Sequence, residues 1–199
     1  MLDPIARRII DPPLNWVAQK ISVSPNLITI IGFGLGVISL IFIIYEYFLL
    51  GLAFLLLNRL ADGLDGAIAR VHNQTSDLGA YLDIVADFLL WALLPLGFAY
   101  INPANAMPAA ILLSSFAMSM TTFLAFAILA EKRNLATTNQ GKKSFFYLAG
   151  LAEGTETILF FSACYIWPSL FITFALAFSA LVYLSSIGRI LSSWRELST

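Results

Sequence analysis

Four aspartates stand in two closely spaced pairs that could hold divalent cations. Asp62 and Asp65 are three residues apart, and Asp83 and Asp87 are four residues apart. In a helix, either spacing puts both side chains of a pair on one face. If a short link joins two antiparallel helices, all four carboxylates converge on one volume.

These carboxylates need compensating charge if they lie in a membrane. An aspartate near the centre of a membrane helix costs about 2.5–3.5 kcal/mol, and less near the interface. Four together repel one another and take up protons unless cations are present. Ligands that are all oxygen favour Mg²⁺ or Mn²⁺ over zinc. The alternative is ion pairing with Arg59 and Arg70, which leaves two of the four charges uncompensated.

Long apolar runs surround the aspartates and predict an integral membrane protein. Of the 199 residues, 59% are hydrophobic and 12% charged, whereas soluble domains carry about 25% charged residues. We predict a single all-α domain over 1–199, with its helix bundle over 25–191. The six predicted transmembrane helices lie near 25–45, 48–71, 77–100, 106–130, 145–167 and 169–191. Cys164 lies in an apolar run and is expected to be a small core residue.

The first 22 residues mix charged and apolar side chains, which favours an amphipathic helix at the membrane interface, broken near Pro12-Pro13. Ser24-Pro25 predicts the start of the first span, since serine caps helices and proline is tolerated at their first position. No cleavable signal peptide is expected, because charges and prolines interrupt this segment.

Lysines and arginines occupy alternate links and predict the orientation. Basic residues precede the first span, lie in the links around 70–76 and 131–144, and end the chain, whereas the other three links contain none. Both termini and the aspartates are therefore expected in the cytoplasm. Arg59 is the exception, about one turn inside the second span. The net charge of −1 gives no reason to expect a nucleic acid partner.

The stretch Asp62-x2-Asp65-Gly66-x2-Ala69-Arg70-x8-Gly79-x3-Asp83-x3-Asp87 resembles, position for position, the signature of the CDP-alcohol phosphotransferases. Its small residues let a ligand approach the backbone closely, although they also suit helix packing in membranes. The resemblance extends over most of the chain, including Pro25-Asn26 and the six predicted spans. It is strongest to the short bacterial and archaeal members that use CDP-diacylglycerol.

The resemblance implies a role for each matching position. The four aspartates would hold two divalent cations, Mg²⁺ or Mn²⁺, and Asp87 would also be the general base. The CDP-diacylglycerol donor would contact Asn26, Thr29, Asp62, Gly66, Ala69, Arg70 and Ser76. A small alcohol would attack the lipid-bearing phosphorus, and CMP would leave. A homodimer among the lipids of a bacterial inner membrane is also implied.

The fifth predicted span carries Glu153-Gly154-Thr155-Glu156-Thr157, and ionisable residues inside a membrane are functional candidates. Relatives that accept phosphorylated or polyol head groups often have Glu-Arg-x-Glu-Arg here. Gly154 and Thr157 replace those arginines, which argues against a phosphorylated acceptor and favours a neutral or amine-bearing alcohol. Glu153 and Glu156 are candidate acceptor ligands, or else partners of Arg59 or Arg189 in helix packing.

Two other functions stay open. The same aspartates could transfer a phosphoalcohol from a CDP-alcohol to a lipid hydroxyl. A cation transporter also uses intramembrane carboxylates, but it predicts them spread through the depth of the bilayer. His72, the single histidine, is expected to be a solvated loop residue rather than a catalyst.

Overall fold

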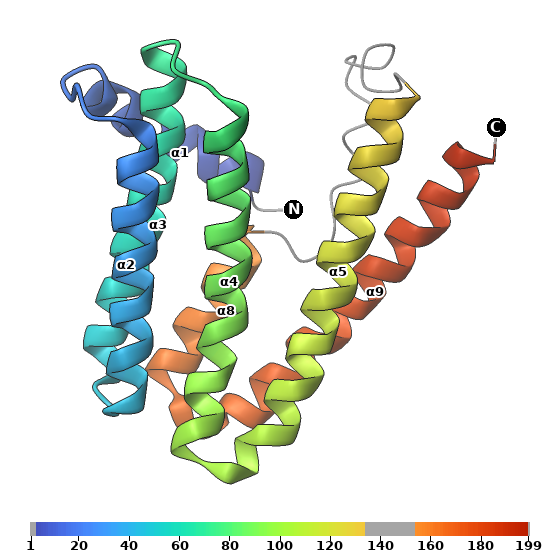
Figure 1. Cartoon of the computed structure of the whole chain (residues 1–199). Helices are drawn as coiled ribbons and strands as arrows, with labels where there is room; N and C mark the ends of the chain where they lie inside the picture. The colour runs from blue at the N-terminus through green and yellow to red at the C-terminus, as the bar shows by residue number, and fades with distance from the viewer. Residues whose placement is uncertain (1–2, 134–153, 199) are drawn as a thin grey trace.

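The computed structural model describes residues 3–133 and 154–198, and every regular element in these ranges is a helix. The links α1–α2 and α3–α4 lie at one end of the bundle, and α2–α3, α4–α5 and α8–α9 at the other (Figure 1). The helices are α1 (Asp3–Ala18), α2 (Pro25–Ile44), α3 (Phe48–Val71), α4 (Asp77–Ile101), η1 (Pro103–Asn105), α5 (Ala106–Lys132), α8 (Gly154–Ile166), η2 (Pro168–Leu170) and α9 (Phe171–Leu197).

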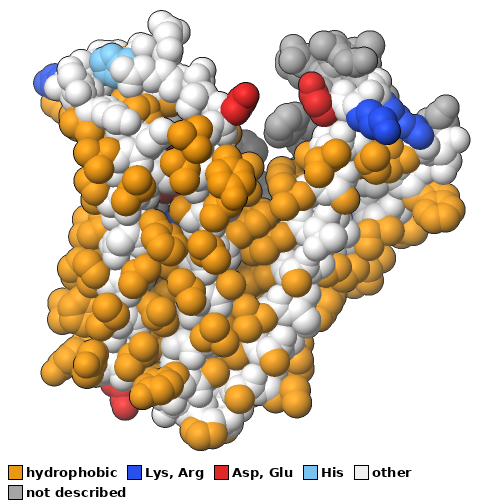
Figure 2. Space-filling model, in the orientation of Figure 1, with side chains coloured by type: hydrophobic (Ala, Val, Ile, Leu, Met, Phe, Trp, Pro, Cys, Tyr) orange, Lys and Arg blue, Asp and Glu red, His pale blue; other side chains and the backbone are white. Residues whose placement is uncertain are grey.

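Four helical segments in the described ranges are long and apolar enough to cross a membrane: Pro25–Ile44, Asp77–Ile101, Pro103–Lys132 and Pro168–Leu197. The predicted count of six is therefore not established. α3 falls outside the four because Arg59, Asp62, Asp65 and Arg70 interrupt its apolar sequence. α8 is too short, at 13 described residues. Hydrophobic side chains cover most of the face shown in Figure 2 between its two ends, as a membrane protein requires.

The N-terminal segment forms one helix, and the predicted break at Pro12-Pro13 is wrong. α1 continues through both prolines. A proline has no N–H, so it leaves the carbonyl four residues earlier without its helical hydrogen-bond donor. In α1 these are the carbonyls of Arg8 and Ile9. Both residues are exposed, so these carbonyls remain accessible to solvent. Trp16 is 59% exposed and lies under the Lys20 ammonium, 3.4 Å from the ring centroid.

Small residues let α2 approach its two neighbours closely. A Cβ at Gly32 would lie 3.1 Å from Cβ of Ala61 on α3, and one at Gly36 would lie 2.7 Å from Leu90 on α4. Ser24 precedes α2 and Pro25 opens it, as predicted, although the Ser24 side chain makes no capping hydrogen bond. This packing brings the start of α2 beside the end of α3 and the start of α4.

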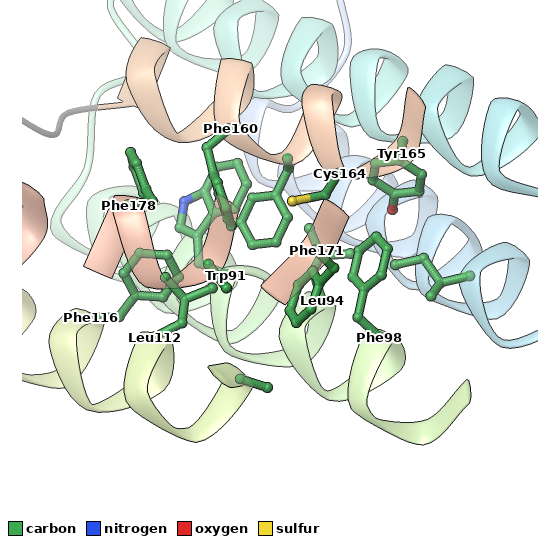
Figure 3. Close-up of a cluster of buried hydrophobic side chains, with 14 of the residues drawn as sticks. Trp91, Leu94, Phe98, Leu112, Phe116, Phe160, Cys164, Tyr165, Phe171 and Phe178 are labelled. Atoms are coloured by element: carbon green, nitrogen blue, oxygen red, sulfur yellow. The ribbon is translucent and has the colours of Figure 1, made fainter. Parts of the chain in front are cut away.

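An aromatic core joins α4, α5, α8 and α9 away from that end (Figure 3). The rings of Phe98 and Phe171 stack at 4.6 Å, and those of Phe160 and Phe178 stack at 4.5 Å. Cys164 is fully buried among these rings, which confirms it as a core residue. The core fixes the second half of the bundle against α4, which carries two of the four aspartates.

Candidate functional site

A polar pocket of about 180 Å³ opens where α2 and α4 begin and α3 ends. Ligand pockets usually measure about 300–1,000 Å³, so this one encloses only part of a large ligand. It is lined by Pro25, Asn26, Thr29, Asp65, Gly66, Ala69, Arg70, Gln74, Thr75, Ser76, Gly79, Ala80 and Asp83. Six of the seven predicted donor contacts and two of the predicted metal ligands thus share one pocket.

Asp65 is the most buried of the four aspartates, at 6% exposed. The Thr29 hydroxyl donates a hydrogen bond of 2.6 Å to its Oδ2 atom. The same hydroxyl lies 3.2 Å from the carbonyl of Pro25, one turn earlier on α2. α2 therefore fixes one oxygen of Asp65 at the pocket wall.

The α3–α4 link shapes the opposite wall of the pocket. Ser76 caps α4, since its hydroxyl accepts a hydrogen bond of 3.1 Å from the Gly79 amide. A Cβ at Gly79 would lie 3.0 Å from Oδ1 of Asn26 and 3.2 Å from Oγ of Ser76. Glycine at this position keeps the pocket open between α2 and α4. Sequence reasoning expected the small residues of the motif, Gly79 among them, to let a ligand approach the backbone closely.

Asp62 and Asp87 lie outside the pocket lining and contact Arg59 instead. Nη2 of Arg59 is 2.7 Å from Oδ1 of Asp87, and Nη1 is 3.6 Å from Oδ2 of Asp62. The Asp62 carboxyl group interacts electrostatically with those of the other three aspartates and makes a side-chain hydrogen bond with Asp83. Asp65 and Asp83 line the pocket, and Asp62 and Asp87 contact Arg59 outside its lining.

Two further residues hold the Arg59 side chain, and sequence reasoning missed both. Its Nε donates a hydrogen bond of 2.7 Å to Oδ1 of Asn58, whose own amide donates to the carbonyl of Gly32. The guanidinium carbon lies 4.7 Å from the centroid of the Trp91 ring. Trp91 follows Asp87 by four residues and therefore shares its helix face. That four-residue spacing is the sequence pattern from which a place for Trp91 beside Asp87 could have been predicted.

The donor set fits a hard divalent cation by its chemistry, because every candidate ligand is a carboxylate or hydroxyl oxygen. Across residues 3–133 and 154–198, however, no group of three or more Asp, Glu, His or Cys side chains is arranged to hold a metal ion. Asp65 and Asp83 are the pair that faces the pocket.

The predicted acceptor residues are only partly described. Glu156 lies half-buried in the first turn of α8, whereas Glu153 falls outside the described residues. Lys142 and Lys143 also fall outside them. Arg189 donates a hydrogen bond of 2.9 Å to the carbonyl of Ser119 on α5.

His72 joins α1 to the end of α3, so the expectation of a solvated loop residue is wrong. Its Nε2 lies 3.0 Å from the carbonyl of Ala18 and 3.1 Å from that of Ile21. Carbonyls only accept hydrogen bonds, so Nε2 carries the proton. The histidine is half-buried and caps the C-terminus of α3, close to the pocket wall.

Comparison with known proteins identifies relatives along the whole chain. The family model for CDP-alcohol phosphatidyltransferase matches residues 22–186. The inner membrane protein YnjF of Escherichia coli (strain K12) is 42% identical over 203 residues, which cover 100% of this chain and 98% of that protein. CDP-diacylglycerol–serine O-phosphatidyltransferase of Helicobacter pylori is 33% identical over 76 residues, 38% of this chain and 32% of that protein.

Solved structures share the fold. Phosphatidylinositol phosphate synthase (PgsA1) of Mycobacterium tuberculosis with CDP-DAG bound superposes with a TM-score of 0.55 at 21% identity, covering 96% of this chain and 93% of that one. The same enzyme in complex with manganese and citrate gives a TM-score of 0.56 at 19% identity, covering 94% and 86%.

Proposed function

The chain belongs to the CDP-alcohol phosphatidyltransferase family and is a transferase of phospholipid synthesis; from this premise we propose that it transfers a phosphatidyl group from CDP-diacylglycerol to a small alcohol and releases CMP. The observation that carries the proposal is the pocket at the ends of α2, α3 and α4. Eight residues expected to bind the donor or its metal line that one volume.

The pocket suits the nucleotide end of the donor. Its volume of about 180 Å³ accommodates a part of the donor rather than the whole lipid. Gly66, Ala69 and Gly79 leave its walls free of bulk, and Arg70 brings an exposed guanidinium to its edge for phosphate oxygens. The diacyl part of the donor would then stay in the surrounding lipid.

Divalent cations held by the aspartates, two Mg²⁺ or Mn²⁺ in this proposal, would offset pyrophosphate charge and stabilise departing CMP when bound. The chain itself supplies position and proton transfer. Asp65, fixed by Thr29, and Asp83 would present oxygens at the pocket. Asp87, whose Oδ1 is held by Arg59, would accept the proton of the attacking hydroxyl on its second oxygen.

The acceptor site would lie toward α8, where Glu156 and Glu153 are the candidate ligands. Since Gly154 and Thr157 supply no charge for a phosphate, we propose a neutral or amine-bearing alcohol. We also propose six spans, the single domain over 1–199, a homodimer, residence in a bacterial inner membrane, and a cytoplasmic active site with both termini on that side. YnjF is named an inner membrane protein, which supports the location.

CMP release from CDP-diacylglycerol tests the proposal with purified protein in nanodiscs. The assay runs with Mg²⁺, Mn²⁺ or a chelator, across serine, inositol, glycerol, glycerol phosphate and inositol phosphate. We expect cation-dependent CMP release with at least one unphosphorylated alcohol. Asp65→Asn should lose donor binding and release, and Asp87→Asn should lose release but keep donor binding. Full turnover by Asp87→Asn contradicts its assignment as base.

The same purified protein, in nanodiscs or reconstituted into proteoliposomes, separates the alternatives. CMP release from a CDP-alcohol and diacylglycerol, but not from CDP-diacylglycerol, favours transfer of a phosphoalcohol to the lipid hydroxyl. Cation flux in proteoliposomes, with no CMP from any donor, favours a transporter and overturns the transferase proposal.

A further inference from the structure

Three residues of the link between α3 and α4 line the pocket: Gln74, Thr75 and Ser76. Ser76 is one of the predicted donor contacts, and its hydroxyl caps α4. Gln74 and Thr75 lie outside the family signature. Both are exposed, and within the described part of the chain neither side chain makes a hydrogen bond. The Gln74 carboxamide is therefore available to a ligand in the pocket.

The backbone of the link is fixed where α3 ends, so the Gln74 side chain starts from a defined position. Asn73 has a φ of 54°, in the left-handed region. The next amide, that of Gln74, donates a hydrogen bond of 2.8 Å to the carbonyl of Ala69, and the Asn73 amide donates one of 3.4 Å to that of Arg70. This is the Schellman closure of a helix, in which glycine or asparagine usually takes the left-handed position.

The charged side chains of the pocket lie deeper than the link. Asp65 is almost two turns before the end of α3, and Asp83 is almost two turns into α4. A Cβ at Gly66 would lie 3.1 Å from Nη1 of Arg70, so this guanidinium lies back over the preceding turn of α3. The link side chains are uncharged. A CDP donor has the same division, since its pyrophosphate is charged and its base is neutral, and the base therefore fits at the link.

We propose that Gln74 determines specificity for the base: its carboxamide oxygen accepts a hydrogen bond from the 4-amino group of the donor's cytosine, and Asn73 is the positioning residue that directs it there. This assignment rests on the proposed function, because it takes CDP-diacylglycerol as the donor. A carboxamide suits the contact, since its oxygen is an acceptor and the cytosine amino group is a donor.

Two other roles for Gln74 predict different results. If Gln74 contacted the ribose or a phosphate, its loss would weaken every pyrimidine nucleotide equally. If its side chain were only solvated, its loss would change no affinity. The ratio of the affinities for two nucleotides that differ only at the 4-position of the base therefore distinguishes the three roles.

The test is calorimetric titration of the full-length protein in nanodiscs with Mg²⁺ present. The two ligands are CMP and the 5′-monophosphate of 2-pyrimidinone riboside, which has hydrogen in place of the 4-amino group. We expect wild type to bind CMP about fivefold more tightly than this analogue, the usual effect of one hydrogen bond. In Gln74→Ala this preference should fall below twofold, through weaker binding of CMP.

Two further variants test the chemistry of the contact. Gln74→Glu keeps an acceptor oxygen, so the preference for CMP should remain although the added negative charge weakens both nucleotides. Gln19→Ala is the matched control, because Gln19 is an exposed glutamine outside the pocket lining. Its preference should equal that of wild type.

Asn73 is tested through the same preference. Asn73→Gly keeps the left-handed turn, because glycine adopts a positive φ without steric cost, and should keep the fivefold preference. Asn73→Val places a β-branched residue in a conformation that strains it, and should lower the preference below twofold. Full preference in Asn73→Val overturns the positioning role.

An unchanged preference in Gln74→Ala, or equal weakening of both nucleotides, overturns the role of Gln74. Failure of the proposed function is a separate observation. If wild type releases CMP from CDP-diacylglycerol but binds the two nucleotides equally, the proposed function stands and the role of Gln74 is wrong. If wild type neither releases CMP nor binds either nucleotide, both are wrong.

Discussion

The Thr29 hydroxyl on α2 donates a 2.6 Å hydrogen bond to Oδ2 of Asp65 on α3. Hydrogen bonds to charged groups are worth about 1.5–3 kcal/mol. Thr29→Val keeps the side-chain shape and removes the donor, so CDP-diacylglycerol should bind about tenfold more weakly. Equilibrium binding of the donor in the presence of Mn²⁺ measures this. Thr29→Ser retains the hydroxyl and should stay within about twofold of wild type; equal loss in both variants would assign the effect to packing instead.

Gly79 keeps the pocket open between α2 and α4. A Cβ there would lie 3.0 Å from Asn26 Oδ1 and 3.2 Å from Ser76 Oγ, so Gly79→Val should crowd the donor. We expect a KM for CDP-diacylglycerol at least tenfold higher, with the thermal midpoint little changed because Gly79 lies at the pocket and outside the aromatic core. Gly188→Ala is the control, since nothing lies within 4 Å of a Cβ added at that position. A normal KM in Gly79→Val would show that the donor does not enter here.

Gly51 allows α3 to pass close to the Tyr165 ring. A Cβ at this position would lie 2.5 Å from that ring, which is fully buried and whose hydroxyl hydrogen-bonds Ser39. Overpacking of this kind costs about 1–3 kcal/mol, more than the roughly 1 kcal/mol that alanine gains in a helix. Gly51→Ala should therefore lower the thermal midpoint by several degrees.

Gly34→Ala is the matched control, because no atom lies within 4 Å of the added Cβ. Its midpoint should equal or exceed that of wild type. A thiol-reactive fluorogenic dye can follow the thermal unfolding of both variants. The chain has a single cysteine, Cys164, which is buried in the fold and becomes reactive only when the protein unfolds. Equal midpoints for the two variants would contradict the packing argument.

His72 ties α1 to α3, the helix that carries Asp62 and Asp65. Its Nε2–H faces the carbonyls of Ala18 and Ile21, and both bonds are lost in His72→Leu. We expect faster amide hydrogen exchange over residues 8–21, with little change in the aromatic core. His72→Gln retains an N–H donor and should exchange more slowly than His72→Leu. Identical exchange in His72→Leu and wild type would show that apolar packing alone holds α1.

Helix positions followed from local sequence because each long apolar run must satisfy its own backbone in a membrane. The starts at Pro25 and Asp77 agree with the predictions within a residue or two. The break at Pro12-Pro13 was wrong because the carbonyls of the exposed residues Arg8 and Ile9 tolerate the loss of their helical hydrogen bonds. The six-span count could not be established, since α3 carries charges for the site and only 13 residues of α8 are described.

The sequence alone determined the family, through the spacing of its motif, and the helical character, through its apolar runs. Helical spacing and a short link predict that the four aspartates converge. Only the tertiary structure decided which partner each of those carboxylates contacts. Arg59 is three residues from Asp62, so their pairing on one helix face can be predicted from the sequence. Its bond to Asp87 and its contact with Trp91 cross from α3 to α4. Which charge meets which partner depends on helix rotation and packing, and no local spacing records those.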